Sequence, residues 1–205
     1  MKQYLVVLAS LLFLTSCEVP EDKNEEGTIS NSDSLEAFGD TMTVIEPLGD
    51  TLKPTAAAEK FFSGKEIDTK NVQPGQVVEF AKTLIGIPYK YASIDPAAGF
   101  DCSGFITYVF KHFDILVPRS SIDFTMVGTE VPEASAQPGD LVLFTGTDSA
   151  DKFVGHMGLV VSNENGLMSF IHSTSGKQHG VTITPMSEYY RGRYMKTIRI
   201  FPQNK

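Results

Sequence analysis

Hydrophobic residues recur at regular spacing only from about residue 72 onward. Two segments there repeat apolar residues every three or four positions, which predicts amphipathic helices packed on a core. The first helix is expected from Pro74 to Gly86, because proline is favoured in the first turn and glycine just past the end. The second is expected to begin at Cys102. Shorter helical stretches are expected within residues 56–62 and 120–128.

The C-terminal part changes to short apolar runs separated by turns rich in glycine and asparagine, which is typical of β-strands. Helices followed by a run of strands favour an α+β fold, with an antiparallel sheet of about five strands packed against N-terminal helices. Residues 71–205 are long enough to form one such domain with its own core. The strands are expected at residues 140–145, 155–162, 167–173, 180–184 and 194–201.

The first seventeen residues have the pattern of an export signal. Lys2 supplies a positive start, and the apolar core that follows is too short to span a bilayer. The core ends in Leu14-Thr15-Ser16-Cys17, which resembles a bacterial lipobox, in which the cysteine is acylated and becomes the new N-terminus. We therefore expect Cys17 to be lipidated and to anchor the protein in a membrane. An ordinary cleaved signal with a chance cysteine is the alternative.

Residues 18–70 are expected to form an acidic, flexible tether between this anchor and the domain. The chain has a net charge of −8, and residues 1–53 hold ten of its 25 acidic residues but only three of its 17 basic ones. Repulsion between like charges should extend this segment. The domain itself is close to neutral, so we expect no nucleic-acid partner.

Cys102 is the candidate nucleophile. It is the one cysteine left once Cys17 is lipidated, and an unpaired cysteine in an exported protein indicates a reactive thiol or an intermolecular bridge. It follows Asp101, a suitable N-cap, so the positive end of the helix dipole is expected to lower the pKa of the thiol. The alternative is a small buried core residue, against which the polar neighbours argue.

A cysteine nucleophile needs a base and a group that orients the base. His156 and His172 lie in neighbouring predicted strands. If Val161 pairs with Leu167 across the intervening turn, the two histidines face each other with Cβ atoms about 4.5–5.5 Å apart. A register change of one residue would place them on opposite faces of the sheet.

The other histidines, His112 and His179, are expected to be exposed. A zinc site made by Cys102, His156 and His172 is an alternative use of the same side chains. No paired cysteines or closely spaced histidines accompany them, so we expect no metal and no other cofactor.

Several motifs follow one another in a fixed order over about residues 72–201. They are Pro88-Tyr89-Lys90-Tyr91, Asp101-Cys102-Ser103-Gly104-Phe105, Pro118-Arg119-Ser120, Gly139 to Phe144, Gly155 to Leu159 and Phe170 to Ser173. In order and spacing these motifs resemble the NlpC/P60 family. The family is similar to papain-like cysteine peptidases in architecture, and its members cleave the peptide stems of bacterial cell wall, typically between γ-D-glutamyl and a diamino acid.

The resemblance implies that Cys102 is the nucleophile, His156 the base and His172 the residue that orients the base. It also implies roles around the substrate and oxyanion for four residues. These are Tyr89, Asp101, Ser103 and Arg119, with simple structural roles as the alternative for the last three.

Two departures from the family pattern are expected to reshape the substrate groove without changing the catalytic trio. Many members have a Gly-Gly pair soon after the tyrosine motif, where this chain has Ala92-Ser93. A glutamine often follows the Arg-Ser segment, where this chain has Ile122-Asp123-Phe124.

We therefore expect a lipid-anchored, monomeric cysteine endopeptidase that hydrolyses peptidoglycan stem peptides through an acyl-enzyme on Cys102. Two alternatives stay open: a catalytically inactive peptidoglycan-binding lipoprotein, and another papain-like amidase or acyltransferase. The expected location is the cell envelope, at the outer membrane facing the periplasm, with which Glu18 after the anchor is compatible.

Overall fold

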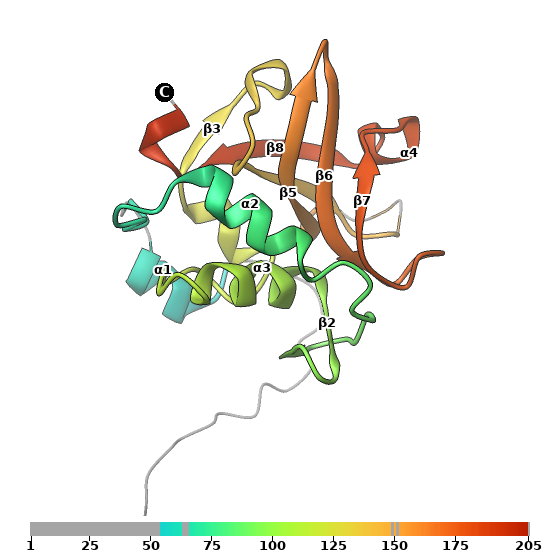
Figure 1. Cartoon of the computed structure of the whole chain (residues 1–205), viewed down its shortest axis with the longest axis horizontal. Helices are drawn as coiled ribbons and strands as arrows, with labels where there is room; N and C mark the ends of the chain where they lie inside the picture. Colours follow the sequence, from blue (N-terminus) through green and yellow to red (C-terminus); the bar gives the residue numbers. More distant parts are fainter. Residues whose placement is uncertain (1–53, 63–65, 149, 151, 205) are drawn as a thin grey trace, which may run out of the picture. The chain divides into compact units, whose positions relative to one another are not determined.

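The computed structural model describes residues 54–62, 66–148, 150 and 152–204 (Figure 1). The export signal, Cys17 and most of the tether lie outside these residues. The helices are α1 (Ala56–Phe62), α2 (Pro74–Lys82), α3 (Cys102–Lys111) and α4 (Glu188–Arg191), with 3-10 turns η1 (Asp123–Met126), η2 (Glu133–Ser135) and η3 (Pro202–Asn204). The strands are β1 (Ile94–Asp95), β2 (Gly99–Phe100), β3 (Thr129–Val131), β4 (Leu141–Thr145), β5 (Val154–Glu164), β6 (Leu167–Thr174), β7 (Gly180–Pro185) and β8 (Tyr194–Arg199).

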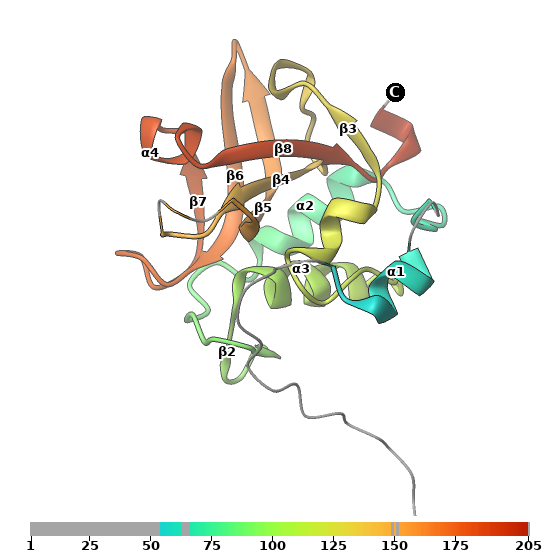
Figure 2. The ribbon, with the colours of Figure 1, turned by 180° about the vertical axis from the view of Figure 1, so that it is seen from behind.

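The main sheet is antiparallel and has six strands, in the order β3-β8-β4-β5-β6-β7. The predicted α+β class is confirmed, and all five predicted strands are present. The sixth strand, β3, was not predicted, since it has only three residues and two of them are exposed. Both views show β8 crossing the direction of β5 and β6, so the sheet is strongly twisted (Figures 1 and 2).

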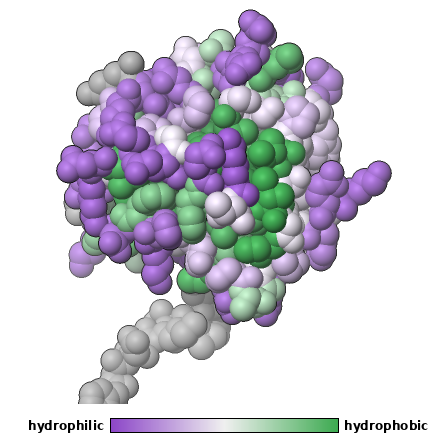
Figure 3. All heavy atoms as spheres, in the orientation of Figure 1, coloured by the Kyte–Doolittle hydropathy of each residue, from purple (hydrophilic) through white to green (hydrophobic). Residues whose placement is uncertain are grey.

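Helices α2 and α3 cover one face of the sheet (Figures 1 and 2). Most of their apolar residues are buried in the larger core, and Phe105, Ile106 and Phe110 are fully buried, each contributing about 1.5–3 kcal/mol. A smaller core, with Phe144 and Phe170, lies on the opposite face. The helices stop short of β7, and Figure 3 shows hydrophobic residues gathered on the surface beside them.

The described part of the predicted tether contains structure. Helix α1 forms where one or two helical turns were expected, and the backbone N–H of Thr55 just before it donates to Asp123 Oδ1 at 2.7 Å. Ile67 and Thr69 are buried against the domain. Asp123 belongs to the segment Ile122-Asp123-Phe124, where this chain differs from the family pattern. The side chain of Asp123 attaches the start of α1 to the domain.

A buried ion pair joins the start of β4 to the end of β8. Asp140 is fully buried and accepts hydrogen bonds from Arg199 Nε at 3.1 Å and Nη2 at 2.8 Å. It also accepts from the backbone N–H of Gln137 and the side chain of Asn204. Removing the cation leaves this carboxylate buried without its charge partner, which is costly.

Arg199→Met is therefore expected to lower the free energy of unfolding by about 3 kcal/mol. The matched control is Arg191→Met, because Arg191 pairs with Glu133 in a more exposed position, where the loss should be below about 1 kcal/mol. Urea unfolding measures both variants. Equal losses would contradict this role for the buried pair.

Candidate active site

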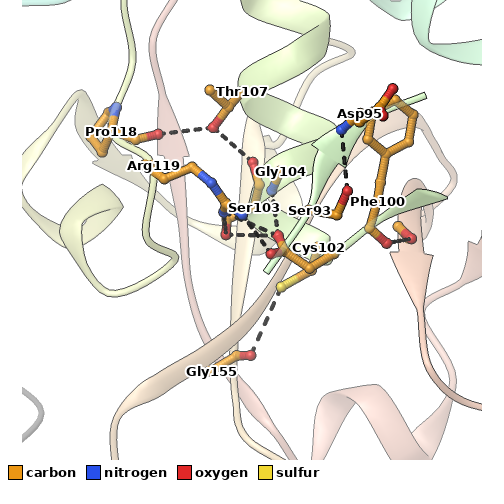
Figure 4. Close-up of polar contacts among 12 residues, drawn as sticks. Ser93, Asp95, Phe100, Cys102, Ser103, Gly104, Thr107, Pro118, Arg119 and Gly155 are labelled. Atoms are coloured by element: carbon orange, nitrogen blue, oxygen red, sulfur yellow. Dashed lines mark hydrogen bonds and ion pairs between the residues drawn. The ribbon is translucent and has the colours of Figure 1, made fainter. Parts of the chain in front are cut away.

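Cys102 is the first residue of α3 and lies partly exposed at its start. Asp101 is the N-cap, and its carboxylate accepts from the backbone N–H of Gly104 at 2.5 Å, as predicted. The sulfur lies 4.0 Å from the carbonyl oxygen of Gly155 at the start of β5. Figure 4 shows the sulfur directed toward Gly155 and away from the side chains around Arg119.

Close packing requires a glycine at position 104 of the cysteine motif. A Cβ atom on Gly104 would lie 2.1 Å from the carbonyl oxygen of Ser93. The same carbonyl accepts from the backbone N–H of Asp101 at 3.1 Å. Only glycine therefore lets the loop before β1 pack against the start of α3, which holds Cys102 in place.

Asp101, Ser103 and Arg119 form a cluster behind Cys102 (Figure 4). Arg119 donates to both carboxylate oxygens of Asp101, at 3.1 and 2.6 Å, and to Ser103 Oγ at 2.9 Å. Asp101 and Ser103 are buried. In the described part of the chain, none of the three lines the cleft at Cys102. These contacts fix the helix start, and a contact with substrate stays a prediction.

His156 and His172 are in direct contact. His156 Nε2 lies 2.8 Å from His172 Nδ1, and His172 Nε2 lies 2.9 Å from Thr184 Oγ1 on β7. His172 is fully buried. Because His156 uses Nε2 for this bond, Nδ1 is the ring nitrogen left to accept a proton from a thiol.

The predicted register of these strands is wrong, although the predicted contact is present. At the turn Glu164 pairs with Leu167, so the connection is the two-residue turn Asn165-Gly166, and both of its residues have positive φ. A bulge at Val161 then shifts the pairing by one residue. Without that shift the two histidines would project from opposite faces of the sheet.

Beyond the bulge Leu159 pairs with Ile171. Continued by one residue, this register places His172 opposite Gly158 and diagonal to His156. The two side chains therefore lie on the same face but two residues apart, and the rings span the diagonal. A Cβ atom on Gly158 would meet the Phe170 ring at 2.6 Å, so glycine is needed at this crossing.

Aromatic side chains enclose the histidine pair. Tyr190, from α4, lies edge-on to His172 with ring centroids 5.6 Å apart and stacks on His156 at 6.4 Å. Phe144 and Phe170 pack on the other sides of the rings. Burial, followed by the nearby cation of Arg193, lowers the pKa of His172 to about 4. Burial, His172 and Arg193 also hold the pKa of His156 well below its usual value.

A cleft of about 690 Å³ opens at Cys102 and His156. Tyr89, a predicted site residue, also lines it, and burial and the neighbouring Cys102 raise the pKa of its hydroxyl. Sequence reasoning missed most of the other lining residues, which come from loops, from α4 and from the end of β7 without a recognisable motif. These include Thr147, Lys177, Gln178, Thr184, Tyr189, Tyr190 and Arg193.

Arg193 places a positive charge in this cleft. Its guanidinium donates to the carbonyl oxygens of Thr145 and Gly146 and to the hydroxyl of Tyr189. Among the described residues it makes no ion pair with a carboxylate. The charge therefore favours the neutral form of both histidines.

The prediction that the helix start lowers the pKa of the thiol is wrong. Burial, followed by the carboxylate of Asp101, raises the pKa of Cys102 to about 11. The backbone N–H groups of Ser103, Met157 and Cys102 act in the predicted direction, but they do not outweigh desolvation. The raised pKa of Cys102 and the lowered pKa values of His156 and His172 favour the uncharged form of all three side chains.

The remaining histidines are exposed, as expected: His112 stacks on Phe80, and His179 lies in the loop before β7. Across the described ranges, no group of three or more histidine, cysteine or acidic residues is placed to hold a metal ion. The described helices are too short or too polar to cross a membrane.

Comparison with known protein families identifies the family of this chain. The sequence model of the NlpC/P60 family matches residues 86–199, more than half of the chain, so the chain belongs to the NlpC/P60 family. It is 36% identical over 135 residues to the gamma-DL-glutamyl hydrolase of Bacillus subtilis (strain 168), a match that covers 66% of this chain and 32% of that protein.

The murein DD-endopeptidase MepS/murein LD-carboxypeptidase of Escherichia coli (strain K12) is 31% identical over 108 residues, covering 52% of each chain. Among solved structures, an NlpC/P60 family protein from Bacillus cereus (ATCC 10987) superposes with a TM-score of 0.57 at 27% identity, covering 65% of this chain and 42% of that one. This chain spans about a third of the length of the first three curated relatives.

Ala92 stands where the resemblance places the first glycine of a pair in many family members, and its backbone conformation favours glycine. Ala92 has a φ of 57°, in the left-handed region that costs an alanine about 1–2 kcal/mol. Ala92→Gly is expected to raise the free energy of unfolding by about 0.5–1 kcal/mol, after the larger entropy of the unfolded glycine chain is subtracted. Ala97→Gly, in the turn between β1 and β2 and outside the left-handed region, is the control and should not stabilise. Urea unfolding measures the free energy of unfolding of both variants. A loss of stability in Ala92→Gly would show that the backbone at Ala92 is not strained.

The lowered pKa of His172 makes stability depend on pH. An unfolded histidine has a pKa of about 6.5, so between pH 6.5 and 4 the unfolded chain binds this proton more tightly. The contribution of neutral His172 to the free energy of unfolding is complete above about pH 6.5. It is lost on acidification, at up to about 1.4 kcal/mol per pH unit.

His172→Gln should therefore show a weaker loss of stability on acidification than the wild type. Urea unfolding of both proteins at about pH 7.5, 6, 5 and 4.5 measures the two slopes. Identical slopes would show that His172 titrates as in an unfolded chain.

Proposed function

We propose that this protein is a cysteine endopeptidase that hydrolyses the peptide stems of peptidoglycan through an acyl-enzyme on Cys102. The observation that carries the proposal is the 2.8 Å contact between His156 Nε2 and His172 Nδ1 beside the cleft that Cys102 lines. This contact leaves His156 Nδ1 to take the thiol proton, and Cys102 and His156 line the same cleft, which supports a nucleophile and its base. The intact trio weighs against a protein that only binds cell wall.

In the proposed reaction the thiol of Cys102 gives its proton to His156 Nδ1 while the sulfur attacks the amide carbonyl carbon. The backbone N–H of Cys102, at the start of α3, can donate to the oxyanion that forms. The imidazolium of His156 returns its proton to the leaving amine. Water then hydrolyses the thioester, with His156 again acting as the base.

The raised pKa of the thiol makes the base essential in this mechanism. With a pKa of about 11, only about one thiol in ten thousand is ionised at pH 7 without assistance. The lowered pKa values favour neutral histidines, which leaves a lone pair on His156 Nδ1 for the proton but also makes that nitrogen a weaker base. His172 then accepts the Nε2–H of the imidazolium and keeps its ring in place.

The substrate is proposed from the relatives, which include a gamma-DL-glutamyl hydrolase and a murein endopeptidase. We propose cleavage between γ-D-glutamyl and a diamino acid. The cleft supports an anionic peptide, because its charged lining residues, within the described part of the chain, are Lys177 and Arg193. Tyr89 borders the same cleft and is proposed to contact the substrate near the oxyanion.

We further propose that the enzyme works outside the cytoplasm as a lipoprotein, anchored through Cys17 to the outer membrane and facing the periplasm. The lipobox-like sequence that ends in Cys17 and the acidic segment after it support this proposal. The acidic segment would let the domain reach cell wall at a distance from the membrane.

Cys102→Ala is expected to abolish the release of fragments from purified peptidoglycan, and His156→Ala to reduce it by at least about a thousandfold. Mass spectrometry of the products identifies the scissile bond and separates an endopeptidase from an amidase. Iodoacetamide should label Cys102 more slowly after His156→Ala, since the proton acceptor is then missing. Unchanged turnover in Cys102→Ala would end the proposal.

A further inference from the structure

The hydrogen bonds of the histidine pair continue beyond His172. This ring is fully buried, and both of its nitrogens are occupied, Nδ1 by His156 and Nε2 by Thr184 Oγ1 at 2.9 Å. Thr184 lies on β7, the edge strand of the sheet, and also lines the cleft. The hydroxyl of Thr184 is therefore the point where the buried chain of hydrogen bonds meets the cleft.

The direction of this chain decides whether His156 can act as a base. In one direction His156 Nε2–H donates to His172 Nδ1, and His172 Nε2–H donates to Thr184, which leaves His156 Nδ1 unprotonated. In the other direction every proton is reversed, and His156 Nδ1 carries a proton and cannot accept another. When His156 becomes an imidazolium, both of its nitrogens carry protons, so only the first direction is compatible with the reaction.

We propose that Thr184 is a positioning residue of the reaction: by accepting the Nε2–H of His172, its hydroxyl holds His172 Nδ1 as the acceptor that the imidazolium of His156 needs. This inference rests on the proposed function. Thr184 acts through His172 and His156, not on the scissile bond.

The packing around His172 makes this hydroxyl difficult to replace. Tyr190 and Phe170 cover the ring with centroids 5.6 and 4.9 Å away, and His172 has no exposed surface through which water could reach it. Loss of the hydroxyl would leave the Nε2–H buried without an acceptor. A buried polar group that loses its partner is strongly disfavoured.

Strand β7 offers a matched control. Thr182 pairs directly with His172 in the strand register, whereas Thr184 pairs with Phe170 and reaches His172 along the diagonal. The Thr182 hydroxyl has a weak contact of 3.5 Å with the carbonyl oxygen of Ile183. The same substitution at Thr182 therefore tests the general effect of a valine on this strand.

The first test is steady-state hydrolysis of a stem peptide by the full chain. Thr184→Val is expected to lower kcat by about ten- to hundredfold and to leave KM within about twofold of the wild type. The reason is that the variant loses stabilisation of the His156 imidazolium, which forms only during the reaction. Thr184→Ser keeps a hydroxyl and should recover most of kcat. Thr182→Val should stay within about twofold of the wild type. Thr184→Ala is the second variant should the valine variant fail to fold.

The second test does not need turnover. Nitrogen-15 NMR of the histidine rings should show Nε2–H on both His156 and His172 in the wild type and in Thr184→Ser. Thr184→Val should show His172 shifted toward the other tautomer or exchanging between the two. Wild-type tautomers or wild-type kcat in Thr184→Val would overturn the inference, and so would an equal loss of kcat in Thr182→Val.

The two proposals can fail separately. A wild-type chain that does not cleave stem peptides would refute the proposed function, and the NMR comparison would still decide whether Thr184 directs the histidine pair. An active wild type with an unaffected Thr184→Val would refute the role of Thr184 alone.

Discussion

A hydrogen bond of 2.8 Å joins the side chains of His156 and His172, and it forms only because β5 and β6 are offset in one particular way. The two-residue turn Asn165-Gly166 sets one pairing register, and the bulge at Val161 shifts this register by one residue. The shift brings the side chains of His156 and His172 to the same face of the sheet. The contact therefore depends on an irregularity five residues away from His156. Packing of Phe144, Phe170 and Tyr190 around the rings then holds the pair in one arrangement.

The pKa shifts at Cys102, His156 and His172 favour the uncharged form of these three side chains. Burial lowers the pKa values of both histidines and raises that of the thiol, and Arg193 acts on the histidines in the same direction as burial. At Cys102 desolvation raises the pKa of the thiol by more than the backbone N–H groups at the helix start lower it. In the proposed reaction the chemistry depends less on a preformed thiolate than on a proton transfer from the sulfur of Cys102 to the imidazole of His156.

Much of the architecture could be predicted from local patterns. The apolar periodicity located α2, α3 and five of the six main strands, and the N-cap at Asp101 formed as expected. The contact between His156 and His172 was predicted from an incorrect register, because Asn165-Gly166 was included in a longer turn. The Asn-Gly pair is itself a strong signal for a two-residue hairpin and could have corrected the turn. The bulge has no such signal, because it depends on how β5 fits against its neighbours.

The sequence by itself determined the helix that begins at Cys102, the order of the strands along the chain and the kinds of side chain available for proton transfer. These follow from short-range spacing, capping and residue chemistry. Only the tertiary structure decided the raised pKa of the thiol, the cation of Arg193 in the cleft and the link from His172 to Thr184. Burial and contacts between distant segments arise from packing of the whole sheet, so no local pattern encodes them.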